Sequence, residues 1–237
     1  MTRFHAPGCT GMGGTPPRRG HGLRPGGSAR GFTLIEVLIS MAIIALLSVV
    51  IIPRAIQLVE KMTANRIAAE LGALRSAANA FQLGTGTFPL RVSHLNNPIT
   101  AADRNTAQIL YLQRHIAQWN GPYTDLDLAA NLGSVTARPI GFGASLHNQL
   151  ICFNPANNQP VTSSPFCRDN SFVALRIAGL LGYQFDLLNL QVDGDESADP
   201  GFGRQTGKLR FIATGGIDLA VQTGVTYYLI GPWSAVR

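Results

Sequence analysis

A single carboxylate stands inside the longest apolar run of the chain. Residues 32–52 read FTLIEVLISMAIIALLSVVII, and Glu36 is the only charged residue among these 21. A helix of this length spans about 30 Å, the thickness of the hydrocarbon core of a bilayer. A carboxylate in such a segment is costly unless a cation pairs with it, so Glu36 is expected to have a function. The alternative is that Glu36 lies at the membrane surface and only contacts water.

A second group of acids lies near the C-terminal end of the chain. Asp193, Asp195, Glu196 and Asp199 are four of the 13 acidic residues, within a stretch of seven. Oxygen ligands at alternate positions suit calcium, so Asp193, Asp195 and Asp199 are candidate ligands. The EF-hand pattern does not hold, because its sixth position is Ala198 and its twelfth is Arg204. The alternative is a solvated polar loop. No other metal or cofactor is expected.

The remaining reactive side chains form no recognisable catalytic set. The three histidines outside the first 31 residues are scattered and have no cysteine or carboxylate partner at metal-ligand spacing. The Gly-x-Gly at position 84 follows a predicted helix rather than a strand, and Ser145 lacks the Gly-x-Ser-x-Gly context of a hydrolase. The sequence therefore predicts a protein that is not an enzyme. The histidines are His94, His115 and His147.

The positive charge is concentrated in the first 31 residues. The formal net charge is +6, and this segment holds five arginines and no acid, so the other 206 residues hold 14 basic and 13 acidic side chains. A nucleic-acid partner is therefore not expected, since Arg168, Arg204, Lys208 and Arg210 are too dispersed to indicate a patch. The Gly/Pro/Arg-rich segment is expected to be disordered. Arginines that precede an apolar span favour an orientation in which their end of the span is cytoplasmic.

The junction between these two segments resembles a known processing site. Gly31-Phe32-Thr33-Leu34-Ile35-Glu36-Val37 is similar to the site at which type IV pilins and type II secretion pseudopilins are cleaved. The resemblance implies that a prepilin peptidase cuts between Gly31 and Phe32 and that Phe32 becomes N-methylated. It further implies that Glu36 pairs with the terminal amine of a neighbouring subunit and that Pro53 kinks the helix. The 31-residue leader is longer than is usual in the family, so Met12 is an alternative to Met1 as the translation start.

The resemblance also implies partners and a location. The expected partners are the prepilin peptidase, other pilins or pseudopilins, an inner-membrane platform protein, an assembly ATPase and, before assembly, membrane lipid. The chain would cross the bacterial inner membrane once, with a cytoplasmic leader and a periplasmic head, and then enter a pilus or pseudopilus fibre. Two alternatives are a minor pilin that acts as an adhesin or DNA receptor, and a membrane-anchored periplasmic enzyme. The motif does not separate a pilus from a secretion pseudopilus, or a major from a minor subunit.

Cysteine usage agrees with an oxidising compartment. Cys9 belongs to the leader, which leaves Cys152 and Cys167 as an even pair. In a periplasmic domain they are expected to form one disulfide. The alternative is two buried free thiols.

The chain therefore divides into four parts: a leader at 1–31, a membrane or fibre-core helix at 32–53, an amphipathic continuation at 54–84 and a globular head at 85–237. In the third part five apolar residues recur at helical spacing and predict one buried face. The expected fold is α+β, with a long N-terminal helix packed on a small antiparallel sheet. The five residues are Ile67, Leu71, Leu74, Ala78 and Phe81.

Within the head, further patterns predict individual elements. Thr100 and Asp103 have the spacing of a capping box, which predicts a helix that includes Ile109, Leu112, Ile116 and Trp119. The apolar segment 172–190 also favours a helix, although its glycines weaken that prediction. Strands are expected at 149–153 and, as a C-terminal hairpin, at 208–213 and 225–230.

Overall fold

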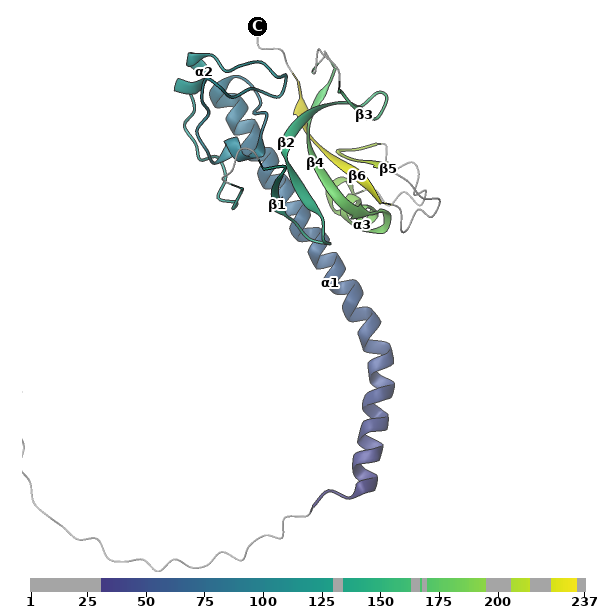
Figure 1. The fold of residues 1–237 in the computed structure, drawn as a ribbon. Helices are drawn as coiled ribbons and strands as arrows, with labels where there is room; N and C mark the ends of the chain where they lie inside the picture. The colour runs from purple at the N-terminus through teal and green to yellow at the C-terminus, as the bar shows by residue number, and fades with distance from the viewer. Residues whose placement is uncertain are drawn as a thin grey trace, which may run out of the picture. The chain divides into compact units, whose positions relative to one another are not determined.

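The computed structural model describes residues 31–129, 134–162, 167, 170–194, 206–213 and 223–233. The chain forms two compact units, Met1–Val49 and Val50–Arg237. In its described part, the first unit is the beginning of one long helix. The second contains the rest of that helix and a globular head (Figure 1).

Helix α1 (Leu34–Thr85) has 52 residues and two kinds of surface. Its first part is apolar all round and exposed, and none of the helix residues before Ala64 is buried. From there on, buried residues recur every three or four positions. Ile67, Leu71, Leu74, Ala78 and Phe81 are each at most 1% exposed. The predicted buried face is confirmed, and its period is that of a helix lying on a core.

The head is built on one antiparallel sheet with the strand order β1-β2-β4-β6-β5, with β3 added beside β2. β2 pairs with β4 on both sides of an irregularity between Leu146 and Leu150, and β4 pairs with β6, so β4 lies between two neighbouring strands. The α+β fold, with a long helix on an antiparallel sheet, is thus confirmed. The strands are β1 (Thr136–Pro139), β2 (Ser145–Asn154), β3 (Gln159–Pro160), β4 (Phe172–Leu181), β5 (Leu209–Ala213) and β6 (Thr223–Pro232).

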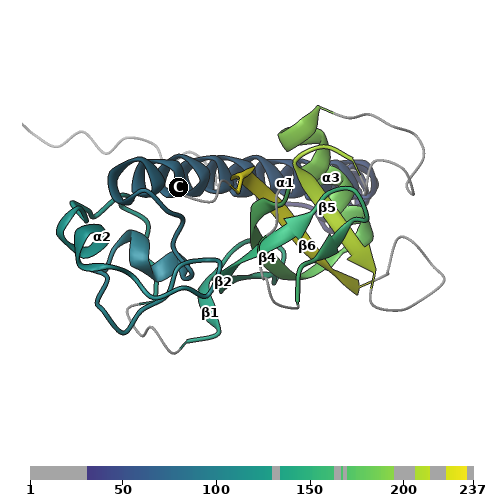
Figure 2. The ribbon, with the colours of Figure 1, turned by 90° about the horizontal axis from the view of Figure 1, so that it is seen from above.

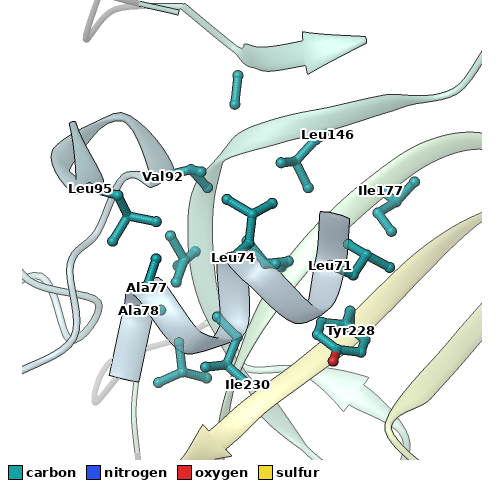
Figure 3. Close-up of a cluster of buried hydrophobic side chains, with 14 of the residues drawn as sticks. Leu71, Leu74, Ala77, Ala78, Val92, Leu95, Leu146, Ile177, Tyr228 and Ile230 are labelled. Carbon is teal, nitrogen blue, oxygen red and sulfur yellow. The ribbon is translucent and has the colours of Figure 1, made fainter. Parts of the chain in front are cut away.

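The buried face of α1 packs on one side of this sheet. Figure 3 shows Leu71 and Leu74 of the helix among Leu146, Ile177 and Tyr228 of three strands. A polar contact adds to this apolar layer, because Arg75 Nε donates a 2.8 Å hydrogen bond to the backbone carbonyl of Ile230.

The last turns of α1 are covered by the connection between the helix and the sheet. This connection contains the 3₁₀ helix η1 (Val92–Leu95) and the short helix α2 (Gln113–Ala117). In Figure 2 the segment that carries α2 lies beside the C-terminal end of α1. The rings of Phe81 and Tyr123 are 5.4 Å apart there.

At the other end of the sheet, α3 (Gly182–Asp193) joins the same core. The ring of Phe185 lies 5.2 Å from that of Phe211 on β5. The carboxylate of Asp193 then fixes the start of β5, since it accepts hydrogen bonds from the backbone N–H groups of Lys208 and Leu209 at 2.9 and 3.0 Å. Gly207 is required here, because it has φ +74° and a Cβ atom would collide with that carboxylate.

The helix predicted from Thr100 onward is wrong. Asp103 Oδ2 does accept hydrogen bonds from the backbone N–H and hydroxyl of Thr100, but these contacts close a turn. The chain then forms isolated bridges, and only Gln113–Ala117 is α-helical. Ile109 and Leu112 are 60% and 53% exposed, so the first half of the apolar period on which the prediction rested faces no core. Only its second half, Ile116 and Trp119, packs against the core.

The helix predicted over residues 172–190 is also wrong in its first half, which is strand β4. Val173, Ala174 and Leu175 are consecutive and all buried, because this central strand is covered on both faces. A strand of this kind has no alternation of apolar and polar residues and cannot be told from a buried helix by its pattern. The second half is helix α3. The strand expected at 149–153 is part of β2, and the C-terminal hairpin of β5 and β6 is confirmed.

Candidate functional site

The candidate site is the start of α1 and the three described residues before it. Gly31, Phe32 and Thr33 have no regular structure, and the helix begins at Leu34. The backbone carbonyl of Thr33 accepts hydrogen bonds from the N–H groups of Glu36 and Val37 at 3.1 and 3.3 Å. The Thr33 hydroxyl lies 3.3 Å from the same Glu36 N–H. Thr33 therefore caps the helix, a role that its spacing of three from a glutamate could have indicated.

Gly31 occupies an open position just before this cap. A Cβ atom at Gly31 would meet no other atom within 4 Å, and its φ lies outside the left-handed region. Neither packing nor backbone conformation within the described residues thus requires a glycine here. A requirement for glycine at this position would have to come from another molecule that binds this segment.

Glu36 lies in the first turn of α1, where the positive end of the helix dipole favours an acid. Its neighbours are apolar and exposed: Phe32 is 82% and Ile35 is 65% exposed. Among the described residues, no ion pair involves the carboxylate of Glu36. The site therefore presents an anion on an apolar surface, and it can accept a cation from another chain.

The hydroxyls further along the apolar segment are satisfied within the helix. Ser40 and Ser48 each donate a 2.7 Å hydrogen bond to the backbone carbonyl four residues earlier, Glu36 and Ile44. An 18-residue window of this helix has a mean hydropathy of 2.9, and none of its residues is buried. A helix that crosses a membrane or packs among similar helices needs an apolar exterior, and its hydroxyl groups need hydrogen-bond partners within the helix. This part of α1 meets both conditions. By length and composition, α1 is long and apolar enough for either.

Pro53 lies inside α1, which is helical on both sides of it. Proline removes one backbone donor and crowds the preceding turn. The kink expected at Pro53 stays a prediction.

Cys152 and Cys167 form a disulfide, with their Cα atoms 5.3 Å apart and a sequence separation of 15. This bridge ties the segment after β3 back to β2. For a loop of this length the chain-entropy model gives a contribution of about 3 kcal/mol.

Of the three proposed calcium ligands, the structure describes Asp193 alone. Its carboxylate is engaged by the backbone N–H groups of Lys208 and Leu209. Asp195 and Asp199 lie outside the described residues, so the calcium site stays a prediction. In the part of the chain that is described, no three His, Cys, Asp or Glu side chains come together as a metal site.

His94 is the most buried of the histidines, with a side chain that is 1% exposed. Its Nε2 lies 3.5 Å from Asp103 Oδ1, which is long for a hydrogen bond. Burial lowers the pKa of His94, an effect that Asp103 opposes and Arg91 reinforces. Burial would raise the pKa of Asp103, but hydrogen bonds from Thr100 and the nearby His94 and Arg91 bring it below its ordinary value. The sequence gives no signal for this burial, because it results from the packing of η1.

Several other histidine, aromatic and arginine residues belong to the head. His115 and Trp119 lie in or beside α2, and Trp119 donates a hydrogen bond to the backbone carbonyl of His94. Tyr227 and Tyr228 are buried on β6. Arg168 and Arg204 lie outside the described residues.

One family model matches the chain. Residues 27–52 match the prokaryotic N-terminal methylation motif, which covers the candidate site and the apolar part of α1. This match supports the resemblance to type IV pilins and pseudopilins. No curated protein and no solved structure matches the chain.

Proposed function

We propose that the protein is a prepilin-like structural subunit, cleaved by a prepilin peptidase after Gly31 and assembled into a fibre through α1. The observation that carries this proposal is the match of residues 27–52 to the methylation motif, at the start of a helix whose apolar 18-residue window has no buried residue. The apolar surface needs a partner, which is lipid before assembly and the helices of other subunits afterwards.

The open geometry at Gly31 supports the cleavage site. A peptidase must reach the Gly31–Phe32 peptide bond, and this bond lies before the helix, where the chain has no regular secondary structure. Nothing in the described chain crowds Gly31. The enzyme can therefore reach this position and recognise that it carries no side chain. Residues 1–31 would be removed, and the new N-terminal Phe32 amine would be methylated.

Glu36 supplies the assembly contact in this proposal. The freed amine of Phe32 carries a positive charge, and inside a bundle of apolar helices both charges are costly unless they meet. A neighbouring subunit at the right axial position pairs its amine with Glu36. A misaligned subunit leaves a buried carboxylate unpaired, so the pair also selects the register.

The cleavage is tested by mass spectrometry of the protein extracted from the cell envelope. We expect an N-terminal methylated Phe32 and no residue from 1–31. An intact leader, or a cut after Ile52, would overturn the proposal.

The assembly contact is tested with Glu36→Ala. The variant should insert into the membrane normally but enter fibres poorly, which is measured as the fraction of protein in sheared or cross-linked fibres. Ser40→Ala is the matched control, since Ser40 lies one turn further along and its hydroxyl bonds only to its own helix. Normal incorporation of Glu36→Ala would remove the pairing from the proposal and leave the cleavage site untouched.

A further inference from the structure

A pocket of about 330 Å³ opens in the head, remote in sequence from the start of α1. It is lined by the segments that precede η1 and β1, by Gln108 of the connection, and by residues of β2 and β4. Leu175 and Ile177 of β4 face the core under α1, so Arg176 between them lies on the opposite face of the sheet. The lining residues are Leu90, Arg91, Gln108, Ser134, Val135, His147, Asn148, Gln149 and Arg176.

The pocket coincides with an irregularity in the sheet. Leu146 pairs with Ile177 and Leu150 with Leu175, so residues 147–149 of β2 stand opposite Arg176 alone. A regular ladder would place one residue there instead of three. Bulges of this kind re-aim side chains and are common beside binding sites.

The bulged segment is held in place by other parts of the chain. The backbone N–H of Asn148 donates to the carbonyl of Val135 at 2.8 Å, and that of Leu150 donates to Leu90 at 2.7 Å. Arg91 and Gln149 form an isolated bridge. The pocket wall is therefore fixed by backbone hydrogen bonds on both sides of the bulge, as expected for a preformed site.

Two of the lining side chains carry buried donors with no partner among the described residues. These atoms are Arg176 Nε and Asn148 Nδ2. Asn148 Oδ1 accepts a 2.9 Å hydrogen bond from the backbone N–H of Ser93, which fixes the amide and leaves its nitrogen as the free group. A buried unsatisfied donor is costly, so such atoms are normally paired with solvent or a ligand. Both of these require an acceptor.

The charge around the pocket has one sign. Arg91, His147 and Arg176 line it, and none of the described lining residues is acidic. The guanidinium of Arg91 also interacts electrostatically with the carboxylate of Asp103, and this interaction offsets part of the positive charge of Arg91. Burial, reinforced by Arg176, lowers the pKa of His147, so at neutral pH this ring is a neutral hydrogen-bond partner. Among the described residues that line the pocket, Arg176 is then the main charge without a described ion-pair partner.

We propose that this pocket binds a compact oxyanion, either a phosphate or a carboxylate group, with Arg176 as its principal ligand. A guanidinium matches both groups in shape and charge and forms two parallel hydrogen bonds to them. The proposal does not depend on the cleavage or assembly of the protein.

The test is isothermal titration of the full-length protein in a non-ionic detergent at constant ionic strength. One arm uses inorganic phosphate and the other uses citrate. We expect saturable binding to one site in at least one arm, and the arm that binds identifies the chemical class. Binding in neither arm would overturn the proposal.

Variants locate the site. Arg176→Gln should weaken binding by about tenfold or more, because it removes the charge-assisted hydrogen bonds. Arg138→Gln is the matched control, since Arg138 lies on neighbouring β1 and its Nε is 3.8 Å from Glu70 rather than in the pocket. Equal weakening by both variants would overturn the proposal. Should Arg176→Gln not fold, Arg91→Gln removes the other arginine of the lining without altering β4, and unchanged affinity in that variant would overturn the proposal.

Discussion

At the scale of single residues, polar groups on the apolar helix differ in whether the chain itself satisfies them. The hydroxyls of Ser40 and Ser48 bond to their own helix, and Thr33 caps its first turn. The carboxylate of Glu36 cannot be satisfied by a backbone carbonyl, because both are acceptors. Its partner must be a donor, and in the proposed fibre that donor is the terminal amine of another subunit.

Gly31→Leu should stop processing. The side chain fits without strain within the protein itself, since no described atom lies within 4 Å of a Cβ at this position. A loss of cleavage would therefore report recognition by the peptidase and not misfolding. The measurement is the ratio of full-length to processed protein on an immunoblot.

The matched control is Gly72→Ala, at a glycine on α1 that is equally free of contacts but outside the motif. It should be processed normally. Cleavage of Gly31→Leu at the normal rate would contradict the proposed site.

His94 should make the stability of the head depend on pH. Its pKa in the folded state is lowered from 6.5, chiefly by burial, so the unfolded chain binds its proton more readily. The free energy of unfolding is then unaffected above about pH 7 and falls as the pH drops below 6.5 towards the folded pKa. Denaturant unfolding followed by tryptophan fluorescence, at pH 8 and pH 5, measures this fall.

His94→Gln should reduce the difference in stability between the two pH values. His115→Gln is the comparison, because the pKa of His115 is also lowered by burial but its side chain lies on short, largely exposed α2. An equal pH dependence in wild type and His94→Gln would exclude His94 as the main cause.

At the scale of elements, α1 was predictable because its signals are local. Its apolar run and its spacing of three and four residues are both properties of a helix alone. Strand β4 was not, because its burial on both faces depends on β2, β6, the core under α1 and the cluster on the opposite face. The turn at Thr100 also shows that a capping contact can form without a helix after it.

Leu74→Ala should destabilise the head by about 2–5 kcal/mol, since it leaves a cavity in the layer between α1 and the sheet. Leu74 is 1% exposed, whereas Leu83 on the same helix is 88% exposed. Leu83→Ala is therefore the control and should change stability by no more than about 0.5 kcal/mol. The denaturant midpoints of the two variants measure their stabilities. Equal losses of stability in Leu74→Ala and Leu83→Ala would contradict the packing described.

At the scale of the whole molecule, composition separates a basic N-terminal segment from an apolar helix and a head, which together have a nearly balanced charge. Such a chain is expected to cross the inner membrane once with its arginines in the cytoplasm. The disulfide between Cys152 and Cys167 is consistent with a head in an oxidising compartment.

This orientation predicts the activity of reporter fusions. Alkaline phosphatase is active only where its disulfides form, so it should be active when fused after Arg237. The same reporter fused after Arg30 should be inactive, and this fusion is the control. The reverse pattern would place the head in the cytoplasm and contradict the proposed topology.

The sequence by itself determined the features that depend only on neighbouring residues or on composition. These are the methylation motif, the apolar helix, its amphipathic continuation and the C-terminal hairpin. Only the tertiary structure decided the rest: that residues 172–181 are a strand, that His94 is buried and that a bulge in β2 places Arg176 in a pocket. Each of these depends on contacts between segments far apart in the chain, and the burial they produce has no signature in the spacing of neighbouring residues.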